Sequence, residues 1–170
     1  MPVQLPWAWA SVDATFHGQT FRFATTHLDP ISGAAQVAQA NEFLAGPGGT
    51  SLPVIWVGDF NSNAEGTVIT GVPDATATYG NIIAAGFSDA WRTKHPADPG
   101  FTCCHDTDLL NPTPALTARI DLVLTKGVFG VEEATIVGDE VADRLPSGLW
   151  PSDHAGVVVS FQLEDEDEQN

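Results

Sequence analysis

The sequence is poor in basic residues. Its 170 residues include 6 Lys and Arg against 22 Asp and Glu, so the formal net charge is −16 at pH 7. A chain this acidic repels a polyanion unless a divalent metal or high salt intervenes, which argues against a nucleic-acid binder that relies on basic patches. An enzyme that meets phosphate through a metal ion is not excluded.

Long hydrophobic runs are missing as well. No segment approaches the roughly eighteen consecutive apolar residues of a membrane-spanning helix. The opening stretch, MPVQLPWAWA, lacks the basic start and the continuous apolar core of a signal peptide. We therefore expect no membrane span and no signal peptide in this chain, and the sequence does not set a compartment.

Cysteine is scarce: Cys103 and Cys104 are the only two. Adjacent cysteines rarely bridge each other because the ring that they would close is strained. Without CxxC spacing they also make a poor zinc site. We expect small, partly buried thiols, with a vicinal disulfide as the alternative.

Length and composition fit one globular domain followed by an acidic tail. The chain has 43% hydrophobic residues and five Trp, enough for a sizeable core, and its length is typical of a single domain. The last seven residues, EDEDEQN, contain almost only acids and amides. We expect a domain over residues 1–163 and a solvated, disordered tail over residues 164–170.

Turn chemistry separates apolar segments that are typical of strands, and helical patterns lie between them. The expected strands cover residues 7–16 and 19–28, which form a hairpin, and residues 52–60, 118–125, 133–140 and 154–163. A helix is expected from Ser32, which caps it, to Ala45, and a shorter one over residues 79–86. The proline-rich stretch from Thr93 to Thr117 is predicted to be a long surface loop. Together these elements predict an α/β layered architecture.

Polar residues stand at the ends of four of these strands or inside them. They are His27 and Asp29 in TTHLDP, Asp59 and Asn61 in GDFN, Asp121 in RIDLVL, and Asp153 and His154 in PSDHAGV. Residues i and i+2 of a strand point the same way, so each spaced pair emerges side by side. An unpaired carboxylate inside an apolar strand is costly to bury.

Each of these features has a plain structural alternative. GDFN and PSD could be turns, because Asp, Asn, Gly and Ser favour turns. His27 could be a hydrogen-bonded core histidine, and Asp121 could pair with Arg119. Four such features in one small chain nevertheless predict a site at one edge of the sheet.

The residue types favour phosphoester hydrolysis. Carboxylate and amide oxygens suit a hard cation such as Mg²⁺, which polarises a phosphoryl oxygen and steadies the leaving group. A histidine oriented by a carboxylate takes a proton from water. The chain has no GxxxxGK[ST] loop, HExxH helix or GxSxG elbow, so P-loop, zinc-protease and serine-hydrolase mechanisms have no support.

The motifs TTHLD, VGDFNS, RIDLVL and GLWPSDHAGV, in this order, resemble the endonuclease/exonuclease/phosphatase superfamily, whose fold is that of deoxyribonuclease I. The resemblance extends over nearly all of the chain before the acidic tail. It implies an α/β (α+β) layered sandwich, half of a four-layer αββα fold. It also implies a Mg²⁺-dependent phosphodiesterase or endonuclease-type hydrolase, whose substrate is a nucleic acid, a phosphorylated small molecule or a lipid head group.

By this resemblance His154 is the general base or the phosphate-polarising histidine, paired with Asp121. Asp59 and Asn61 orient the water and the scissile phosphate, and His27 contacts the phosphate as an acid or transition-state stabiliser. The identity of the base stays open between His154 and Asp59.

The resemblance also implies a metal site. Asp59, Asn61 and Asp153 are the expected ligands, with Mg²⁺ as the expected ion and Mn²⁺ or Ca²⁺ as alternatives. The family's N-terminal asparagine and its metal-binding glutamate have no counterpart in this sequence, so the chain resembles the C-terminal half of such a protein.

A half of a two-sheet sandwich exposes the inner face of its sheet. We therefore expect an apolar face that drives self-association or binds an N-terminal-half partner. The alternative function is a catalytically inactive truncated fragment that acts as a binding or assembly domain.

Overall fold

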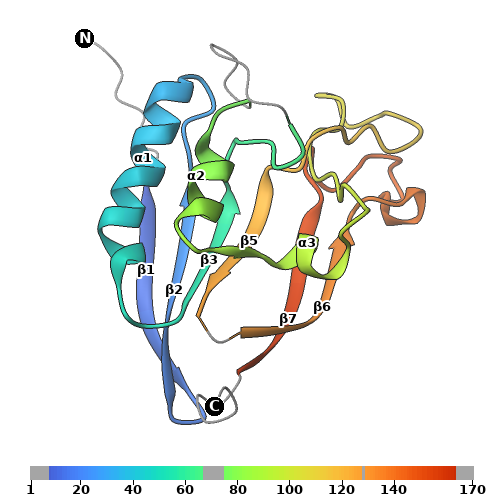
Figure 1. The fold of residues 1–170 in the computed structure, drawn as a ribbon. Coiled ribbons are helices and arrows are strands. Elements are labelled where there is room, and N and C mark those ends of the chain that lie inside the picture. Colours follow the sequence, from blue (N-terminus) through green and yellow to red (C-terminus); the bar gives the residue numbers. More distant parts are fainter. Residues whose placement is uncertain (1–7, 67–74, 128, 164–170) are drawn as a thin grey trace.

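The computed structural model describes residues 8–66, 75–127 and 129–163 (Figure 1). Its strands are β1 (Trp9–Phe16), β2 (Gln19–His27), β3 (Val54–Asp59), β4 (Ser88–Asp89), β5 (Asp121–Lys126), β6 (Phe129–Val137) and β7 (Gly156–Leu163). Its helices are α1 (Gly33–Ala45), α2 (Thr78–Ala84) and α3 (Ala90–Lys94), with short 3-10 turns at Pro47–Gly49 and Val141–Asp143. The acidic tail predicted over residues 164–170 lies outside the described residues, so the domain boundary stays a prediction. No helix in the described ranges is both long and apolar enough to cross a membrane.

Five strands form one mixed sheet in the order β1-β2-β3-β5-β4, and β6 pairs with β7 in a separate antiparallel ribbon. β1 and β2 form the predicted hairpin, which turns at His17 and Gly18, both with positive φ. β2 and β3 are parallel and are joined through α1, the helix predicted from the sequence. The side chain of Ser32 accepts a hydrogen bond from the N–H of Ala35, which caps α1 as expected.

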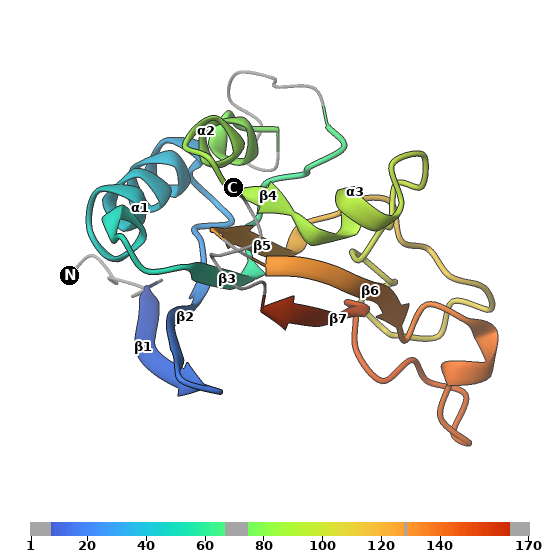
Figure 2. The same ribbon diagram turned by 60° about the horizontal axis from the view of Figure 1, so that its bottom comes forward.

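Trp56 is the centre of the core, on the face of the sheet that the helices cover. Figure 2 shows α1 and α2 together on one side of the sheet. Phe43 of α1 stacks on Trp56 with ring centroids 3.8 Å apart, while Phe60 and Phe87 meet it edge-on. Because side chains alternate along a strand, Val54 and Trp56 face the helices, whereas Ile55 faces the opposite side.

The opposite face is partly covered by the β6–β7 ribbon. Phe129 of β6 meets Phe21 of β2 edge-on at 6.0 Å, and a cavity of about 420 Å³ lies between the ribbon and the sheet. The expectation of an exposed apolar face is therefore wrong in part, because β6 begins earlier than its predicted start and carries Phe129 onto the sheet. Towards the β1 edge Val12 (62% exposed) and Phe16 (59%) stay open to solvent.

The segment predicted as a long surface loop from Thr93 to Thr117 is partly buried. Thr102, His105 and Asn111 are at most 7% exposed. The ring of His105 stacks on Trp150 at 4.0 Å, and the amide of Asn111 donates to His105 Nδ1. The indole N–H of Trp150 in turn donates to the backbone carbonyl of Asn111. These side-chain hydrogen bonds satisfy the polar groups of His105, Asn111 and Trp150, so the segment can be buried although it forms no regular strand.

Arg119 forms a buried ion-pair network that joins three segments. Its side chain is 1% exposed, with Nη1 2.6 Å from Asp89 Oδ2 of β4 and Nη2 2.7 Å from Glu65 Oε1. Tyr79 of α2 donates to the same Asp89 carboxylate, and burial, with Asp89 beside it, raises the pKa of Tyr79 to about 12. Arg92 of α3 also contacts Glu65. The network holds the segment that leads into β5.

Replacing Arg119 by Met should lower the free energy of unfolding by about 3–5 kcal/mol, because it leaves the buried carboxylate of Asp89 without its cation. The matched control is Arg22→Met, which removes an arginine from an exposed pair with Asp13 and should cost far less. Urea unfolding followed by circular dichroism measures both. Equal losses of unfolding free energy in the two variants would show that the buried network contributes no more to stability than the exposed pair.

Candidate active site

Three of the predicted site residues stand side by side because of the strand register. β2 ends at His27, β3 ends at Asp59 and β5 begins at Asp121. His27 is the parallel partner of Asp59, and Asp121 is its antiparallel partner. Residues paired across neighbouring strands project from the same face. The three side chains therefore gather at one end of the sheet, where β2 and β3 finish and β5 starts. His27 Nε2 lies 3.5 Å from Asp59 Oδ2.

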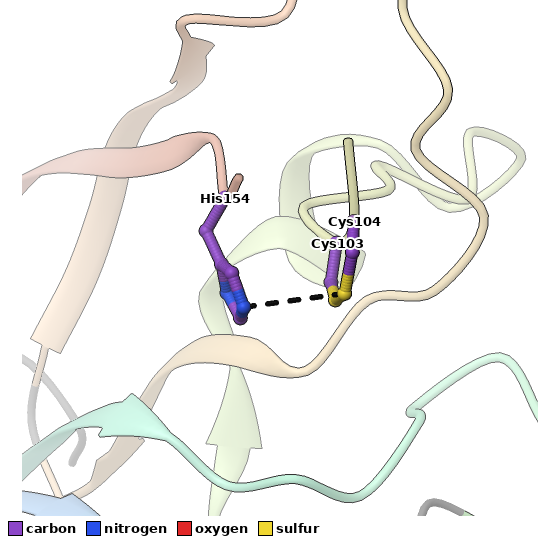
Figure 3. A group of neighbouring side chains, drawn as sticks. All are labelled: Cys103, Cys104 and His154. Atoms are coloured by element: carbon purple, nitrogen blue, oxygen red, sulfur yellow. Dashed lines mark hydrogen bonds between the residues drawn. A yellow bond between two sulfur atoms is a disulfide. The ribbon is translucent and has the colours of Figure 1, made fainter. Parts of the chain in front are cut away.

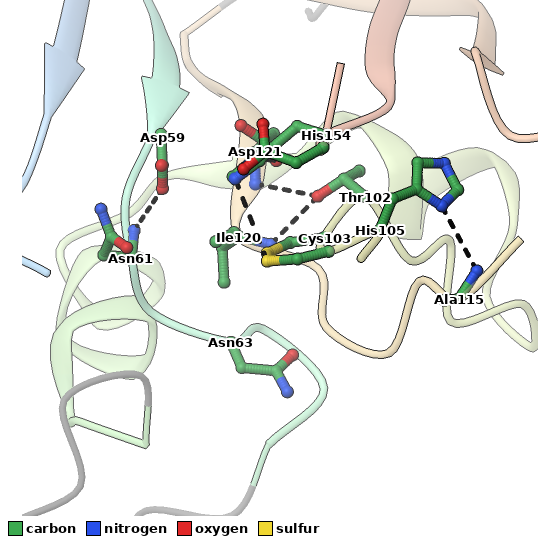
Figure 4. The surroundings of a disulfide bond; sticks show 12 residues. Asp59, Asn61, Asn63, Thr102, Cys103, His105, Ala115, Ile120, Asp121 and His154 are labelled. Carbon is green, nitrogen blue, oxygen red and sulfur yellow. Dashed lines mark hydrogen bonds and ion pairs between the residues drawn. A yellow bond between two sulfur atoms is a disulfide. The ribbon is translucent and has the colours of Figure 1, made fainter. Parts of the chain in front are cut away.

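His154 joins this group from the segment just before β7. Its Nδ1 donates to Asp121 Oδ2 at 2.8 Å, so the predicted Asp121–His154 hydrogen bond is present (Figure 4). The alternative pairing of Asp121 with Arg119 is not formed, because Arg119 is bound to Glu65 and Asp89. The carboxylate oxygens of Asp59 and Asp121 and a ring nitrogen of His154 all lie within 4.8 Å of one another.

Asn61 holds the turn that follows β3. Its backbone N–H donates to Asp59 Oδ1 at 2.8 Å, and its side-chain amide donates to the carbonyl of Leu28 at 3.0 Å. Its φ is 47°, a left-handed conformation that asparagine tolerates better than most residues. The amide of the fully buried Gln36 donates to the carbonyl of Asn61, which ties the turn to α1. Sequence reasoning missed Gln36, since a glutamine on a helix carries no signal of this contact.

Gly58 precedes Asp59 at the point where β2 and β3 approach each other. It has a φ of 139°, and a Cβ added there would lie 1.9 Å from the carbonyl oxygen of Thr26. A side chain at this position would push the two strands apart. Gly58 therefore belongs to the geometry that brings Asp59 next to His27.

Two of the polar residues at strand ends, Asp153 and Asp29, are not among the groups that converge within 4.8 Å. The side chain of Asp153 is exposed, and its backbone carbonyl accepts a hydrogen bond from the N–H of His105. Asp29 Oδ1 accepts from the N–H groups of Ile31 and Ser32 and so stabilises the turn before α1. Asp29 therefore has a structural role.

The charges of the site act on two of its members. The hydrogen bond that His154 donates to Asp121 raises the pKa of His154, and the negative charges of Asp121, Asp59 and Asp153 act in the same direction. Burial raises the pKa of Asp59, the charge of Asp121 adds to this, and the Asn61 N–H opposes it. Negative charge thus contributes to both shifts, although burial is the main cause for Asp59, and a divalent cation would offset that charge.

The segment around Thr102 holds both members of the Asp121–His154 pair. Thr102 is fully buried, and its Oγ1 accepts from the N–H groups of Ile120 (3.3 Å) and Asp121 (3.2 Å). Its carbonyl accepts from Ala155 N–H at 2.8 Å. Nothing in the sequence marked this threonine, because its partners are distant along the chain.

Cys103 and Cys104 form the vicinal disulfide that was the alternative to two thiols. Cys103 is 4% exposed and pairs as an isolated β-bridge with both Ala118 and His154. The sulfur of Cys104 lies 4.0 Å from His154 Nε2. The pair therefore borders the site.

The model of the endonuclease/exonuclease/phosphatase family matches residues 4–154, which is most of the chain. The chain belongs to this family. No curated protein sequence matches it.

Solved structures of the endonuclease/exonuclease/phosphatase family share the fold. D. rerio TDP2 complexed with a single-strand DNA product is 21% identical with a TM-score of 0.66, and the match covers 91% of this chain and 61% of that one. A mannosyl-6-phosphatase from Bacteroides thetaiotaomicron VPI-5482 is 20% identical with a TM-score of 0.61, and the match covers 91% and 55%. A family protein from Beutenbergia cavernae DSM 12333 is 23% identical with a TM-score of 0.67, and the match covers 95% and 40%.

These matches confirm the expected fold class, a deoxyribonuclease-I-like layered arrangement. At such identities the likeness shows the fold alone. The chain spans between 40% and 61% of the length of these solved chains.

The imidazole of His154 should titrate above the ordinary histidine range in the metal-free chain, and Asp121→Asn should lower its pKa, because the charged hydrogen-bond partner is lost. The raised pKa means that the stabilisation from this pair is fully present below the unfolded-state pKa and is lost as the pH rises through the folded-state pKa. NMR titration of the imidazole protons in the presence of a chelator measures the shift. Asp153→Asn is the control and should lower the pKa less. An unchanged titration curve in Asp121→Asn would contradict the assignment.

Proposed function

We propose that this chain is a divalent-metal-dependent phosphoesterase domain in which water attacks a phosphoester. The observation that carries the proposal is the hydrogen bond between His154 Nδ1 and Asp121 Oδ2 at the sheet edge where Asp59 and His27 also lie. A histidine held by a carboxylate, beside a second carboxylate, is suited to proton transfer and cation binding in the same site.

His154 is proposed to take the proton of the attacking water. Because Nδ1 carries the proton that is donated to Asp121, the lone pair of the neutral ring lies on Nε2. Asp121 holds the ring in place and stabilises the imidazolium that forms. The raised pKa of Asp59 keeps that carboxylate as the second candidate for the base.

His27 is proposed to contact the phosphate. Its side chain is 56% exposed and its Nε2 lies 3.5 Å from Asp59 Oδ2, so it borders the site from the solvent side. A protonated imidazole there would stabilise charge that develops on the phosphoryl oxygens. Asn61 is proposed to act with Asp59 in orienting the water and the phosphate, since its N–H fixes the Asp59 carboxylate.

The residues present fit a hard divalent cation. The carboxylates of Asp59 and Asp121 are the proposed ligands: one oxygen of each lies within 4.8 Å of the other and of a ring nitrogen of His154, and carboxylate oxygens suit Mg²⁺, Mn²⁺ and Ca²⁺. His154 is not a ligand in this proposal, because its free lone pair is the one that takes the proton. The ligand set expected from the sequence was Asp59, Asn61 and Asp153; the distances favour Asp121 over Asp153 as the second carboxylate. When bound, such an ion polarises the phosphoryl oxygen and stabilises charge on the leaving group. Mg²⁺ is the proposed ion.

The proposed substrate class is a phosphoester, whether in a nucleic acid, a phosphorylated small molecule or a lipid head group. The formal charge of −16 repels every one of these substrates, and a bound cation offsets that repulsion locally. Among the solved structures of the family, one is complexed with a single-strand DNA product and another is a mannosyl-6-phosphatase, so the fold serves both large and small phosphoesters.

Hydrolysis of bis(p-nitrophenyl) phosphate in the presence of Mg²⁺ tests the reaction. His154→Ala should lower the rate by about 10²–10⁴-fold, the usual contribution of a general base, and a chelator should abolish it. His17→Ala is the matched control, since His17 lies in the β1–β2 turn outside the site, and it should keep the rate of the unmodified chain. A chain with no rate above that of His154→Ala would sink the enzyme proposal and favour the inactive binding or assembly domain.

The open part of the sheet is proposed to mediate self-association or to bind an N-terminal-half partner. Val12 and Phe16 of β1 are 62% and 59% exposed, beside the apolar cavity under the β6–β7 ribbon. Contiguous exposed apolar surface of this kind commonly marks an interface.

Light scattering should therefore give a mass above 18.0 kDa for the chain alone, with binding of an apolar dye. Substituting both Val12 and Phe16 by Thr should reduce both signals, because it removes apolar surface from the open face. Val141→Thr is the control: this valine is 53% exposed but lies outside the sheet, so its loss should have no effect. A monodisperse monomer that binds no dye would contradict the proposal.

A further inference from the structure

A second set of possible ligands converges on His154, from the side opposite Asp121. Figure 3 shows the imidazole facing the sulfur atoms of Cys103 and Cys104. The two sulfur atoms and a ring nitrogen of His154 lie within 4.8 Å of one another, and His154 Nε2 is 4.0 Å from the sulfur of Cys104. These donors are soft, in contrast to the carboxylates of the proposed catalytic site.

The backbone fixes this arrangement independently of the sulfur atoms. The N–H of Cys103 donates to the carbonyl of Ala118 at 2.9 Å, and the N–H of Ala118 donates back at 2.8 Å. Cys103 also pairs with His154 as an antiparallel bridge. The two cysteines therefore remain beside the imidazole when the bond between their sulfur atoms is opened.

The orientation of His154 is that of a metal-bound histidine. A histidine that binds a metal through one ring nitrogen almost always donates its other N–H to a carboxylate or carbonyl. Here Nδ1 donates to Asp121 Oδ2, which leaves the lone pair of Nε2 on the side of the cysteines. Asp121 is thus the carboxylate partner that a zinc-binding histidine uses at its other ring nitrogen.

We propose that the reduced cysteine pair and His154 form a site for a thiophilic divalent ion such as Zn²⁺, with Cys103 Sγ, Cys104 Sγ and His154 Nε2 as the three protein ligands. Three such ligands with water in the fourth position make a common tetrahedral zinc site. Tetrahedral bonds to sulfur and nitrogen place those two atoms about 3.6 Å apart, so the 4.0 Å between Cys104 Sγ and His154 Nε2 must shorten only slightly.

The site requires reduction of the disulfide first. A trialkylphosphine transfers two electrons to the disulfide and takes up the oxygen of one water molecule, which yields phosphine oxide and two thiols. Binding of Zn²⁺ to the two thiols then releases two protons to the buffer as the two zinc–sulfur bonds form. Cys104 is exposed and the side chain of His154 is 25% exposed, so both the reductant and the ion reach the site from solvent.

Occupation of this site removes His154 from the reaction. Nε2 is the atom that takes the proton from water in the proposed function, and a zinc ion bound to it uses the same lone pair. Zn²⁺ at the cysteines is then an inhibitor that acts only on the reduced chain. This consequence rests on the proposed function, whereas the zinc site itself does not.

Titration with Co²⁺ under anaerobic conditions tests the site without any measurement of turnover. The phosphine-reduced chain should show a thiolate-to-cobalt charge-transfer band and the d–d bands of tetrahedral cobalt, and Zn²⁺ should displace the ion. The disulfide form is the matched control and should show neither band. Asp121→Asn should weaken Co²⁺ binding by about 10–100-fold, the usual effect of removing the partner of a ligating histidine.

Two variants identify the ligands. Cys104→Ala should lower the intensity of the charge-transfer band to that of a single thiolate or less, and His154→Gln should weaken binding at least tenfold. Where a variant does not fold, as judged by circular dichroism, alkylation of the unsubstituted chain decides, because bound Zn²⁺ should protect both thiols from iodoacetamide. A reduced chain without the band, or thiols that Zn²⁺ does not protect, overturns the proposal. Failure of the phosphoesterase proposal shows separately, as a lack of hydrolysis by the disulfide form with Mg²⁺.

Discussion

The pairing register of β3 with β5 is the constraint on which the site depends. Trp56 and Asp59 are three residues apart on β3, so they face opposite sides of the sheet. Trp56 is fully buried under α1, and this burial fixes which face of β3 turns towards the helices. A slip of one residue would bury the Asp59 carboxylate and expose the tryptophan, which makes the register strongly specified. This register places Asp59 opposite Asp121. Asp121 in turn accepts a hydrogen bond from His154, which lies just before β7.

The elements that the sequence predicted are those with local signals. Ser32 marks the start of α1, and the continuous apolar run around Trp56 marks β3, because capping residues and apolar runs are visible within a few residues of sequence. The buried course of the segment around Thr102 had no such signal, since its hydrogen bonds join it to Asp121 and Ala155, far away along the chain. The same reason explains the β6–β7 ribbon, because its contacts with the sheet, such as that of Phe129 with Phe21, join residues that are far apart along the chain.

The polar residues at strand ends illustrate the limit of such patterns. Asp29 follows β2 and Asp59 ends the parallel strand β3, yet Asp29 stabilises the turn before α1 whereas Asp59 lies beside His27 and Asp121. Residue type and spacing do not separate the two, because both carboxylates sit where turn chemistry and metal chemistry use the same side chains. The groups around a side chain in the folded structure distinguish the two roles. His154 is an example, because one of its ring nitrogens faces a carboxylate and the other faces two sulfur atoms.

Soaking crystals of the disulfide form with Mn²⁺ and inorganic phosphate tests most directly whether the sheet edge is a metal-dependent phosphoester site. The anomalous signal of manganese should appear at the carboxylates of Asp59 and Asp121, with the phosphate in contact with His154 or His27. The same soak with Asp59→Asn should lose the signal. A manganese ion bound elsewhere on this acidic surface, or a phosphate that contacts neither histidine, would contradict the central claim.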